Sequence, residues 1–274
     1  MHPLKDWPLE QRRDIVGVFT DIDDTLTTDG AITPDALQAL SELKQAGLHV
    51  IPITGRPVGW SEQFAATWPV DAIVPENGAV ALLRVNRGNL PALYADSSLS
   101  KIYLQDASLR AHNYARMQAV AARVLREVPQ AQVSHDSVGR ETDIAIDHSE
   151  FSLLDEAAIT QVVGIMQQEG MSATVSSIHI NGWYGNHNKL AGAHWIVREL
   201  LGRDLRLEMD RWVYVGDSTN DQLMFEAFAN SFGVANIRRF VPQLTFLPRY
   251  ITASERGAGF AEIVRALLAH RTPT

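Results

Sequence analysis

The chain has 274 residues, of which 46% are hydrophobic and 20% are charged, a composition typical of a globular protein with one large or two smaller domains. Its formal net charge of −8 argues against nucleic acid or an anionic membrane as the main partner. The absence of cysteine excludes disulfides and thiolate metal sites. Because no apolar run approaches the roughly 18 residues of a membrane span and the N-terminus lacks a signal-peptide pattern, we expect a cytoplasmic protein.

The first part of the chain alternates short apolar runs with helical patterns. Runs rich in β-branched residues predict buried strands, whereas apolar residues at helical spacing predict helices. The expected elements are a strand at 15–19, a helix at 33–47, a strand at 49–53, a helix at 60–67 and a strand at 72–74. This alternation predicts a parallel sheet wound with helices.

The middle of the chain follows a different pattern. It predicts a strand at 79–85, a turn at 86–89, a helix at 104–128, an alternating strand at 142–147, a helix at 155–169 and a second alternating strand at 174–183. Alternating strands with two helices suggest an antiparallel sheet with one solvated face. We therefore place an inserted α+β domain at residues 80–185.

After the insert the winding pattern resumes. The expected elements are a helix at 189–201, a strand at 212–215, a helix at 222–229, strands at 231–234 and 250–252, and a helix at 259–270. The predicted fold class is α/β, with a doubly wound, Rossmann-like parallel sheet. Its core is split between residues 1–79 and 186–274, and the α+β domain at 80–185 would serve as a cap.

Polar groups follow several of the predicted core strands. Asp21, Asp23 and Asp24 come directly after the first strand, where three carboxylates repel one another unless a cation holds them. An Asp-rich turn is the alternative. Thr54 and Asp217 also follow core strands, and ligands of parallel sheets bind at the carboxyl ends of the strands. This convergence favours a site.

These carboxylates suit phosphoryl transfer. Asp21 could attack phosphorus and form an aspartyl-phosphate, while Asp23 could protonate the leaving oxygen and then activate water. Asp217 would complete a Mg²⁺ site, with Asp221 as a further ligand or a residue that holds a bound water.

Neighbouring groups suit the phosphate itself. The Thr54 hydroxyl, the Gly55 backbone N–H and the Lys189 ammonium could contact the phosphoryl oxygens. We include Arg56, which follows Gly55, among the expected phosphate-binding residues. Lys189 also opens the helix that returns the chain from the insert to the core.

Four segments in this order resemble the motifs of the haloacid dehalogenase superfamily. They are Asp21-Ile22-Asp23-Asp24-Thr25, Thr54-Gly55-Arg56, Lys189 and Gly216-Asp217-Ser218-Thr219-Asn220-Asp221. The insert between the second and third motifs resembles a type IIB cap. The branch it resembles includes sucrose-phosphate phosphatase and mannosyl-3-phosphoglycerate phosphatase.

The resemblance implies that Asp21 is the nucleophile and Asp23 the general acid/base. It implies that Mg²⁺ is held by the Asp21 carboxylate, the Asp23 backbone carbonyl and Asp217. The sequence departs from the pattern at Asn188, where an acidic residue is commoner, and at Asp24, where many relatives have Gly. Asp24 is left without a role.

The stretch before Lys189 is the expected contact surface for the leaving group. It combines polar and aromatic residues, which suit the hydroxyls and the apolar face of a sugar: His179, Asn181, Trp183, Tyr184, His187 and Asn188. Arg140 and Asp143 are possible partners on the neighbouring strand. Alternatively, these residues belong to the interior and surface of the cap.

We therefore expect a Mg²⁺-dependent phosphomonoester hydrolase that acts on a small phosphorylated metabolite, in particular a sugar phosphate. The alternatives are a phosphotransferase or phosphomutase of the same chemistry, and a non-catalytic phosphometabolite sensor. A small phosphate ester is the expected partner, and the sequence predicts no particular oligomeric state.

Overall fold

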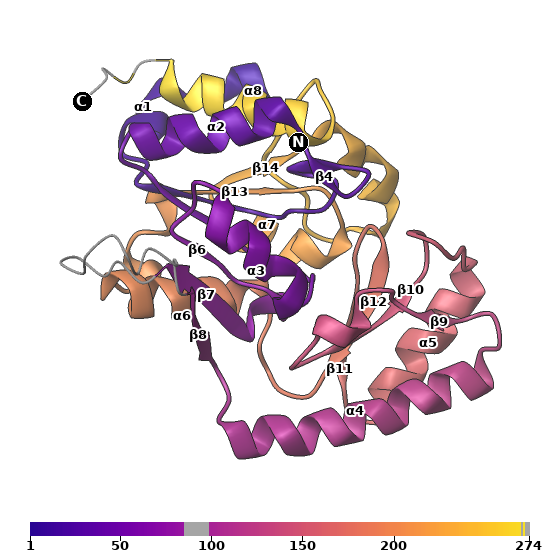
Figure 1. Ribbon diagram of the computed structural model, residues 1–274. Helices are drawn as coiled ribbons and strands as arrows, with labels where there is room; N and C mark the ends of the chain where they lie inside the picture. Colours follow the sequence, from indigo (N-terminus) through magenta and orange to yellow (C-terminus); the bar gives the residue numbers. More distant parts are fainter. Residues whose placement is uncertain (85–98, 270, 272–274) are drawn as a thin grey trace.

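The computed structural model describes residues 1–84, 99–269 and 271 (Figure 1). The turn predicted at 86–89 lies outside the described residues. Within the described part of the chain, no helix combines the length and apolarity needed to cross a bilayer.

A six-stranded parallel sheet forms the centre of the core, in the order β1-β15-β14-β13-β2-β5. Its strands are β1 (His2–Pro3), β2 (Gly17–Thr20), β5 (His49–Pro52), β13 (Trp212–Gly216), β14 (Asn230–Gly233) and β15 (Tyr250–Ile251). A bridge between Ile53 and Val74 extends the sheet to a second group of strands, β6 (Ala72–Ile73), β7 (Val80–Arg84) and β8 (Leu99–Tyr103). A small hairpin of β3 (Thr27–Thr28) and β4 (Ala31–Ile32) follows β2.

Helices cover both faces of this sheet. They are α1 (Leu9–Arg13), α2 (Pro34–Gln45), α3 (Val58–Thr67), α6 (Lys189–Leu201), α7 (Gln222–Ala227) and α8 (Arg256–Leu268). Side chains of β2 alternate between the faces, so that Val18 packs with α2 and α8 while Phe19 packs with α6 and α7. Burial on both faces explains the continuous apolar runs of the core strands. The predicted doubly wound α/β fold is confirmed.

The cap is a separate α+β layer at the lower right of Figure 1. Its antiparallel sheet has the order β11-β12-β10-β9 and carries two helices. The elements are β9 (Gln132–Val133), α4 (Ala107–Glu127), β10 (Ile144–Asp147), α5 (Glu156–Gln168), β11 (Ser172–Val175) and β12 (His179–Trp183). The single strand predicted at 174–183 is wrong: β11 and β12 form a hairpin, with turn-forming serines at 176 and 177 between them.

The predicted start of the insert at residue 80 also needs correction. The hairpin of β7 and β8 pairs with β6, and Val80, Ala81 and Leu82 are buried in the apolar clusters of the core. The chain instead enters the cap at 104–106 and leaves it at 184–188. These two crossings lie side by side, since Gln105 Nε2 donates to the Tyr184 carbonyl at 3.0 Å.

Candidate active site

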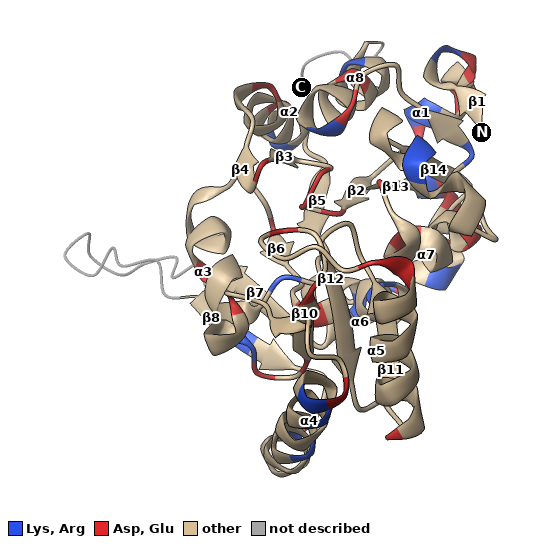
Figure 2. Cartoon of the chain, turned by 90° about the vertical axis from the view of Figure 1, so that its right-hand side faces the viewer, with Lys and Arg blue, Asp and Glu red and all other residues tan. Residues whose placement is uncertain are grey.

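The four predicted motifs meet at the carboxyl ends of the core strands, on the edge that faces the cap. Asp and Glu residues, coloured red in Figure 2, lie in the loops along this edge. Asp21 follows β2, Thr54 follows β5 and Asp217 follows β13, which are parallel neighbours. Lys189 is the first residue of α6, and its Nζ lies 3.0 Å from Asp21 Oδ1 and 2.7 Å from Asp221 Oδ1.

Asp221 is held by protein groups at both carboxylate oxygens. Oδ1 accepts hydrogen bonds from Lys189 and from the Tyr214 hydroxyl. Oδ2 accepts from the backbone N–H groups of Asp217 at 2.9 Å and of Ser218 at 3.1 Å. Asp221 therefore fixes the position of the Lys189 ammonium and closes the loop after β13.

Asp217 has one oxygen bound and one oxygen without a partner. Oδ2 accepts from Asn236 Nδ2 at 2.9 Å, whereas the buried Oδ1 has no hydrogen-bond partner among the described residues. Burial raises the pKa of Asp217 well above its ordinary value, and the nearby carboxylates of Asp221 and Asp21 raise it further. An unpartnered carboxylate oxygen in such surroundings suits a cation.

Asp21 lies beside Asp217. One carboxylate oxygen from each of Asp21, Asp217 and Asp221 lies within 4.8 Å of the other two, and all three residues are buried. The pKa of Asp21 is raised to about 7, chiefly by burial; Lys189 opposes this rise, and the carboxylates of Asp221 and Asp23 add to it. Asp21 Oδ1 also accepts from the Ile22 N–H at 2.8 Å, which orients the carboxylate.

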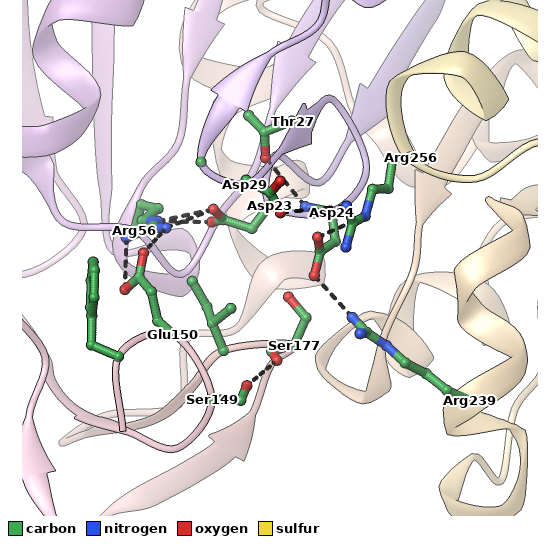
Figure 3. Close-up of a pocket in the computed structure, with 13 residues that line it drawn as sticks. Asp23, Asp24, Thr27, Asp29, Arg56, Ser149, Glu150, Ser177, Arg239 and Arg256 are labelled. Atoms are coloured by element: carbon green, nitrogen blue, oxygen red, sulfur yellow. Dashed lines mark hydrogen bonds and ion pairs between the residues drawn. The ribbon is translucent and has the colours of Figure 1, made fainter. Parts of the chain in front are cut away.

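Asp23, two residues after Asp21, is bound by Arg56 (Figure 3). Arg56 Nε donates to both Asp23 oxygens at 3.0 Å, and Nη2 donates to one of them at 2.9 Å. The same guanidinium contacts Asp136 and Glu150 of the cap at 3.1 and 2.7 Å. Arg56, predicted to bind phosphate, is thus surrounded by carboxylates.

Thr54 and Gly55 line the same small cavity as Asp21. The Thr54 hydroxyl accepts from the Arg56 N–H at 3.0 Å, so its own proton remains available for a ligand. The Gly55 carbonyl accepts from Arg140 at 2.9 Å and from Asn181 at 3.3 Å, which brings two cap residues against the core. Asp143 pairs with Arg140 at 2.7 Å.

The cap residues predicted to contact the leaving group divide into two groups. His179 and Asn181 line the same small cavity as Asp21 and Thr54. The other four make different contacts. Trp183 and Tyr184 belong to the apolar cluster of the cap, and His187 stacks on Trp183. Asn188 Oδ1 caps α6 by accepting a hydrogen bond from the Ala191 N–H at 2.9 Å. The side chain of Asn188, predicted to contact the substrate, thus serves as the N-cap of α6 in this structure.

Asp24 has a structural role that the sequence did not suggest. Its φ of 54° is left-handed, a conformation that glycine adopts more readily than other residues. Its carboxylate pairs with Arg239 at 2.9 Å and with Arg256 at 3.2 Å. Asp24 thereby joins the loop after β2 to the loop after β14 and to the start of α8.

Two cavities adjoin Asp23 and Arg56. The inner one has a volume of about 10 Å³, enough for about one water, and contains Asp21, Asp23 and Thr54 in its walls. The outer one has a volume of about 410 Å³ and is lined by both core and cap. The core contributes Asp23, Asp24, Thr27, Asp29, Gly30, Arg56, Arg239 and Arg256, and the cap contributes Ser149, Glu150, Phe151, Ser177 and Ile178. Figure 3 shows how core and cap residues face each other across it.

Sequence reasoning missed several of these groups. Asn236 and Arg239 follow β14, and the rule that sites gather at the carboxyl ends of parallel strands would have suggested them. Tyr214 lies inside β13, and no local pattern marked its contact with Asp221. Glu150 lies in a cap loop and carried no signal at all.

Comparison with known proteins gives the family. The profile of haloacid dehalogenase-like hydrolases matches residues 18–263. The chain belongs to this family. The resemblance inferred from the motifs is confirmed, and membership makes the chain a hydrolase.

Individual relatives of this hydrolase are distant but cover nearly its whole length. The Streptococcus pyogenes protein "Putative phosphatase M6_Spy0533" is 23% identical over an alignment 266 residues long, which covers 90% of this chain and 96% of the relative. The sucrose-phosphatase of Synechocystis has 15% identity and a TM-score of 0.62, over 92% of this chain and 97% of its own. A sugar phosphatase of HAD subclass IIB, BT4131, has 14% identity and a TM-score of 0.60, over 93% and 98%.

Proposed function

We propose that this hydrolase is a Mg²⁺-dependent phosphomonoesterase that acts through an aspartyl-phosphate on a small phosphorylated metabolite, in particular a sugar phosphate. One observation carries the proposal. Asp21 is buried beside the Lys189 ammonium, 3.0 Å away, and beside the carboxylates of Asp217 and Asp221, and Asp23 follows two residues later.

The residues present fit a divalent cation. The unpartnered Asp217 Oδ1 and the raised pKa values of Asp21 and Asp217 indicate a cluster that lacks positive charge. Asp21, the Asp23 backbone carbonyl and Asp217 would hold Mg²⁺. Asp221, predicted as a further ligand, has both oxygens bound by protein groups, so we assign it to holding Lys189. Bound Mg²⁺ supplies positive charge that favours an ionised Asp21 and neutralises phosphoryl oxygens.

The chain's own groups then divide the reaction into two steps. In the first, an Asp21 oxygen attacks phosphorus, the ester bond breaks and Asp23 gives a proton to the leaving oxygen. In the second, Asp23 takes a proton from water, which attacks phosphorus and releases phosphate and free Asp21. Throughout, Lys189, the Thr54 hydroxyl and the Gly55 N–H contact the phosphoryl oxygens.

The outer cavity supports a polar, sugar-like leaving group. Asp23, the proposed acid, lines both cavities. A leaving group that Asp23 protonates would therefore occupy the outer cavity. That cavity combines carboxylates, hydroxyls and arginines with the exposed ring of Phe151. Such a lining matches hydroxyl groups and the apolar face of a sugar.

The direct test is turnover of p-nitrophenyl phosphate with Mg²⁺, followed by a panel of phosphorylated metabolites. We expect equal release of p-nitrophenol and inorganic phosphate, complete loss of turnover in Asp21→Asn, and higher kcat/KM for sugar phosphates than for nucleotides. A wild-type protein that hydrolyses no phosphate ester would contradict the proposal. Transfer of the phosphoryl group to an added sugar, without phosphate release, would instead indicate a phosphotransferase.

A further inference from the structure

Arg56 has no N–H group left for a substrate. Nε and Nη2 bind Asp23, Nη2 also binds Glu150 at 2.7 Å, and Nη1 binds Asp136 at 3.1 Å and Glu150 at 3.4 Å. The face of the guanidinium lies 5.0 Å from the Trp60 ring centroid. Although burial opposes the charge, Asp23 and Glu150 raise the pKa of Arg56. Its partners are carboxylates of the core and of the cap.

The cap holds its two carboxylates firmly. Glu150 Oε2 lies 2.9 Å from His179 Nε2, and the Glu150 backbone N–H donates to Asp147 at 2.9 Å. Asp136 accepts from Ser134 at 2.7 Å and from Arg140 at 3.2 Å. Glu150 and Asp136 therefore reach Arg56 from a fixed surface of the cap.

On the core, the position of the Asp23 carboxylate depends on its contact with Arg56. Asp23 has a carboxylate that a forked guanidinium can fix in both position and rotation, which a lysine ammonium cannot do. Arg56 is itself on the loop after β5, and its guanidinium binds Asp23 of the core and Glu150 of the cap at the same time. Separation of the cap from the core would remove Glu150 and Asp136 and free the guanidinium to move.

We propose that Arg56 does not bind the substrate phosphate but is a positioning residue, which holds Asp23 in place for proton transfer while Glu150 and Asp136 of the cap hold Arg56. This rests on the proposed function, in which Asp23 protonates the leaving oxygen. The cap thereby assembles the proton-transfer geometry as it meets the core.

The test compares two esters of similar size. p-Nitrophenyl phosphate has a weakly basic leaving group that departs without a proton, whereas benzyl phosphate needs one. The ratio kcat/KM reports the formation of the aspartyl-phosphate, the step in which Asp23 acts as an acid. We expect Arg56→Lys to lower kcat/KM for benzyl phosphate by roughly 10²-fold and to change the value for p-nitrophenyl phosphate much less.

The cap link is tested by Glu150→Gln, with Glu141→Gln as the matched control. Glu141 is also a cap residue bound to the core, to Tyr103 at 2.6 Å and to Lys101 at 3.1 Å, but it does not touch Arg56. We expect Glu150→Gln to show the same preference for the good leaving group as Arg56→Lys, to a smaller extent, and Glu141→Gln to show none.

The outcomes separate the two proposals. Equal losses on both esters in Arg56→Lys, or identical behaviour of Glu150→Gln and Glu141→Gln, would overturn the positioning role. A wild-type protein inactive on both esters would instead overturn the proposed function. Thermal melting shows whether each variant folds, and if Arg56→Lys does not fold, the contrast between the two glutamate variants decides.

Discussion

At the scale of single residues, neighbouring carboxylates of one loop have different surroundings. Asp21 is buried against Lys189, Asp23 is paired with Arg56, and Asp24 is paired with Arg239 and Arg256. Successive side chains of a tight loop point in different directions, so adjacent acids can serve different purposes. We assign nucleophilic attack to the first, proton transfer to the second and loop anchoring to the third.

The role of Asp23 gives the first prediction. Asp23→Ala removes the proton donor but keeps the backbone carbonyl that we assign to Mg²⁺. We expect turnover of a poor leaving group to fall by roughly 10²–10⁴-fold while Mg²⁺ binding, measured by calorimetry, is largely retained. Unchanged turnover in this variant would remove Asp23 from the mechanism.

At the scale of elements, the start of α6 is fixed by a close contact between two backbones. Gly78 has a φ of +102° and lies against Gly192 of α6. A Cβ on Gly192 would meet Gly78 Cα at 2.6 Å, a distance that real side chains do not adopt. This contact holds the first turn of α6, which carries Lys189.

The second prediction follows from this contact. Alanine inside a helix usually stabilises a protein by roughly 0.5–1 kcal/mol relative to glycine. Gly192→Ala should instead destabilise by roughly 1–3 kcal/mol in chemical denaturation, because backbone must move, and should lower turnover by shifting Lys189. Gly164→Ala in α5, where a Cβ meets nothing within 4 Å, is the matched control and should stabilise. Equal effects at the two sites would show that the contact is unimportant.

At the scale of the whole molecule, core and cap are joined by the ion pairs around Arg56, and acid should break them. Burial opposes ionisation of Asp136 and Glu150, but Arg140 lowers the pKa of Asp136 to about 2, and His179 and Arg56 lower that of Glu150 to about 2. A lowered carboxyl pKa contributes stability above the unfolded-state value of about 4, and this stability is lost as the pH falls towards 2.

The third prediction uses this pH window. The free energy of unfolding of the wild type should fall between about pH 4.5 and 2, and Glu150→Gln should show a shallower fall because glutamine does not titrate. Glu141→Gln, which also removes one cap carboxylate, is the control. A fall of the same steepness in Glu150→Gln and the wild type would contradict the assignment of this pH dependence to Glu150.

The acidic cluster gives the fourth prediction. Mg²⁺ that binds only the folded protein should raise the melting temperature, with a stabilisation of about 2.7 kcal/mol at a hundredfold excess over Kd. Asp217→Asn should abolish most of this shift, since Asp217 Oδ1 is the oxygen without a partner. An undiminished shift would place the cation elsewhere.

The sequence alone determined the fold of the core and predicted which residues gather at its strand ends. Local patterns were sufficient to predict that three residues lie close together, namely Asp21, Thr54 and Asp217. Each follows a predicted parallel strand, and parallel strands all end at the same edge of the sheet. The doubly wound sheet followed from alternating strands and helices for the same reason.

Only the tertiary structure decided how the cap meets the core. The apolar strand at 80–84 fits either domain as a pattern, and its pairing with β6 assigned it to the core. Arg56 contacts Asp136 and Glu150, which lie 80 and 94 residues further along the chain, and no periodicity links such positions. Contacts between distant segments depend on the packing of whole layers, so the partner of Asp23 and the link to the cap emerged only from the folded chain.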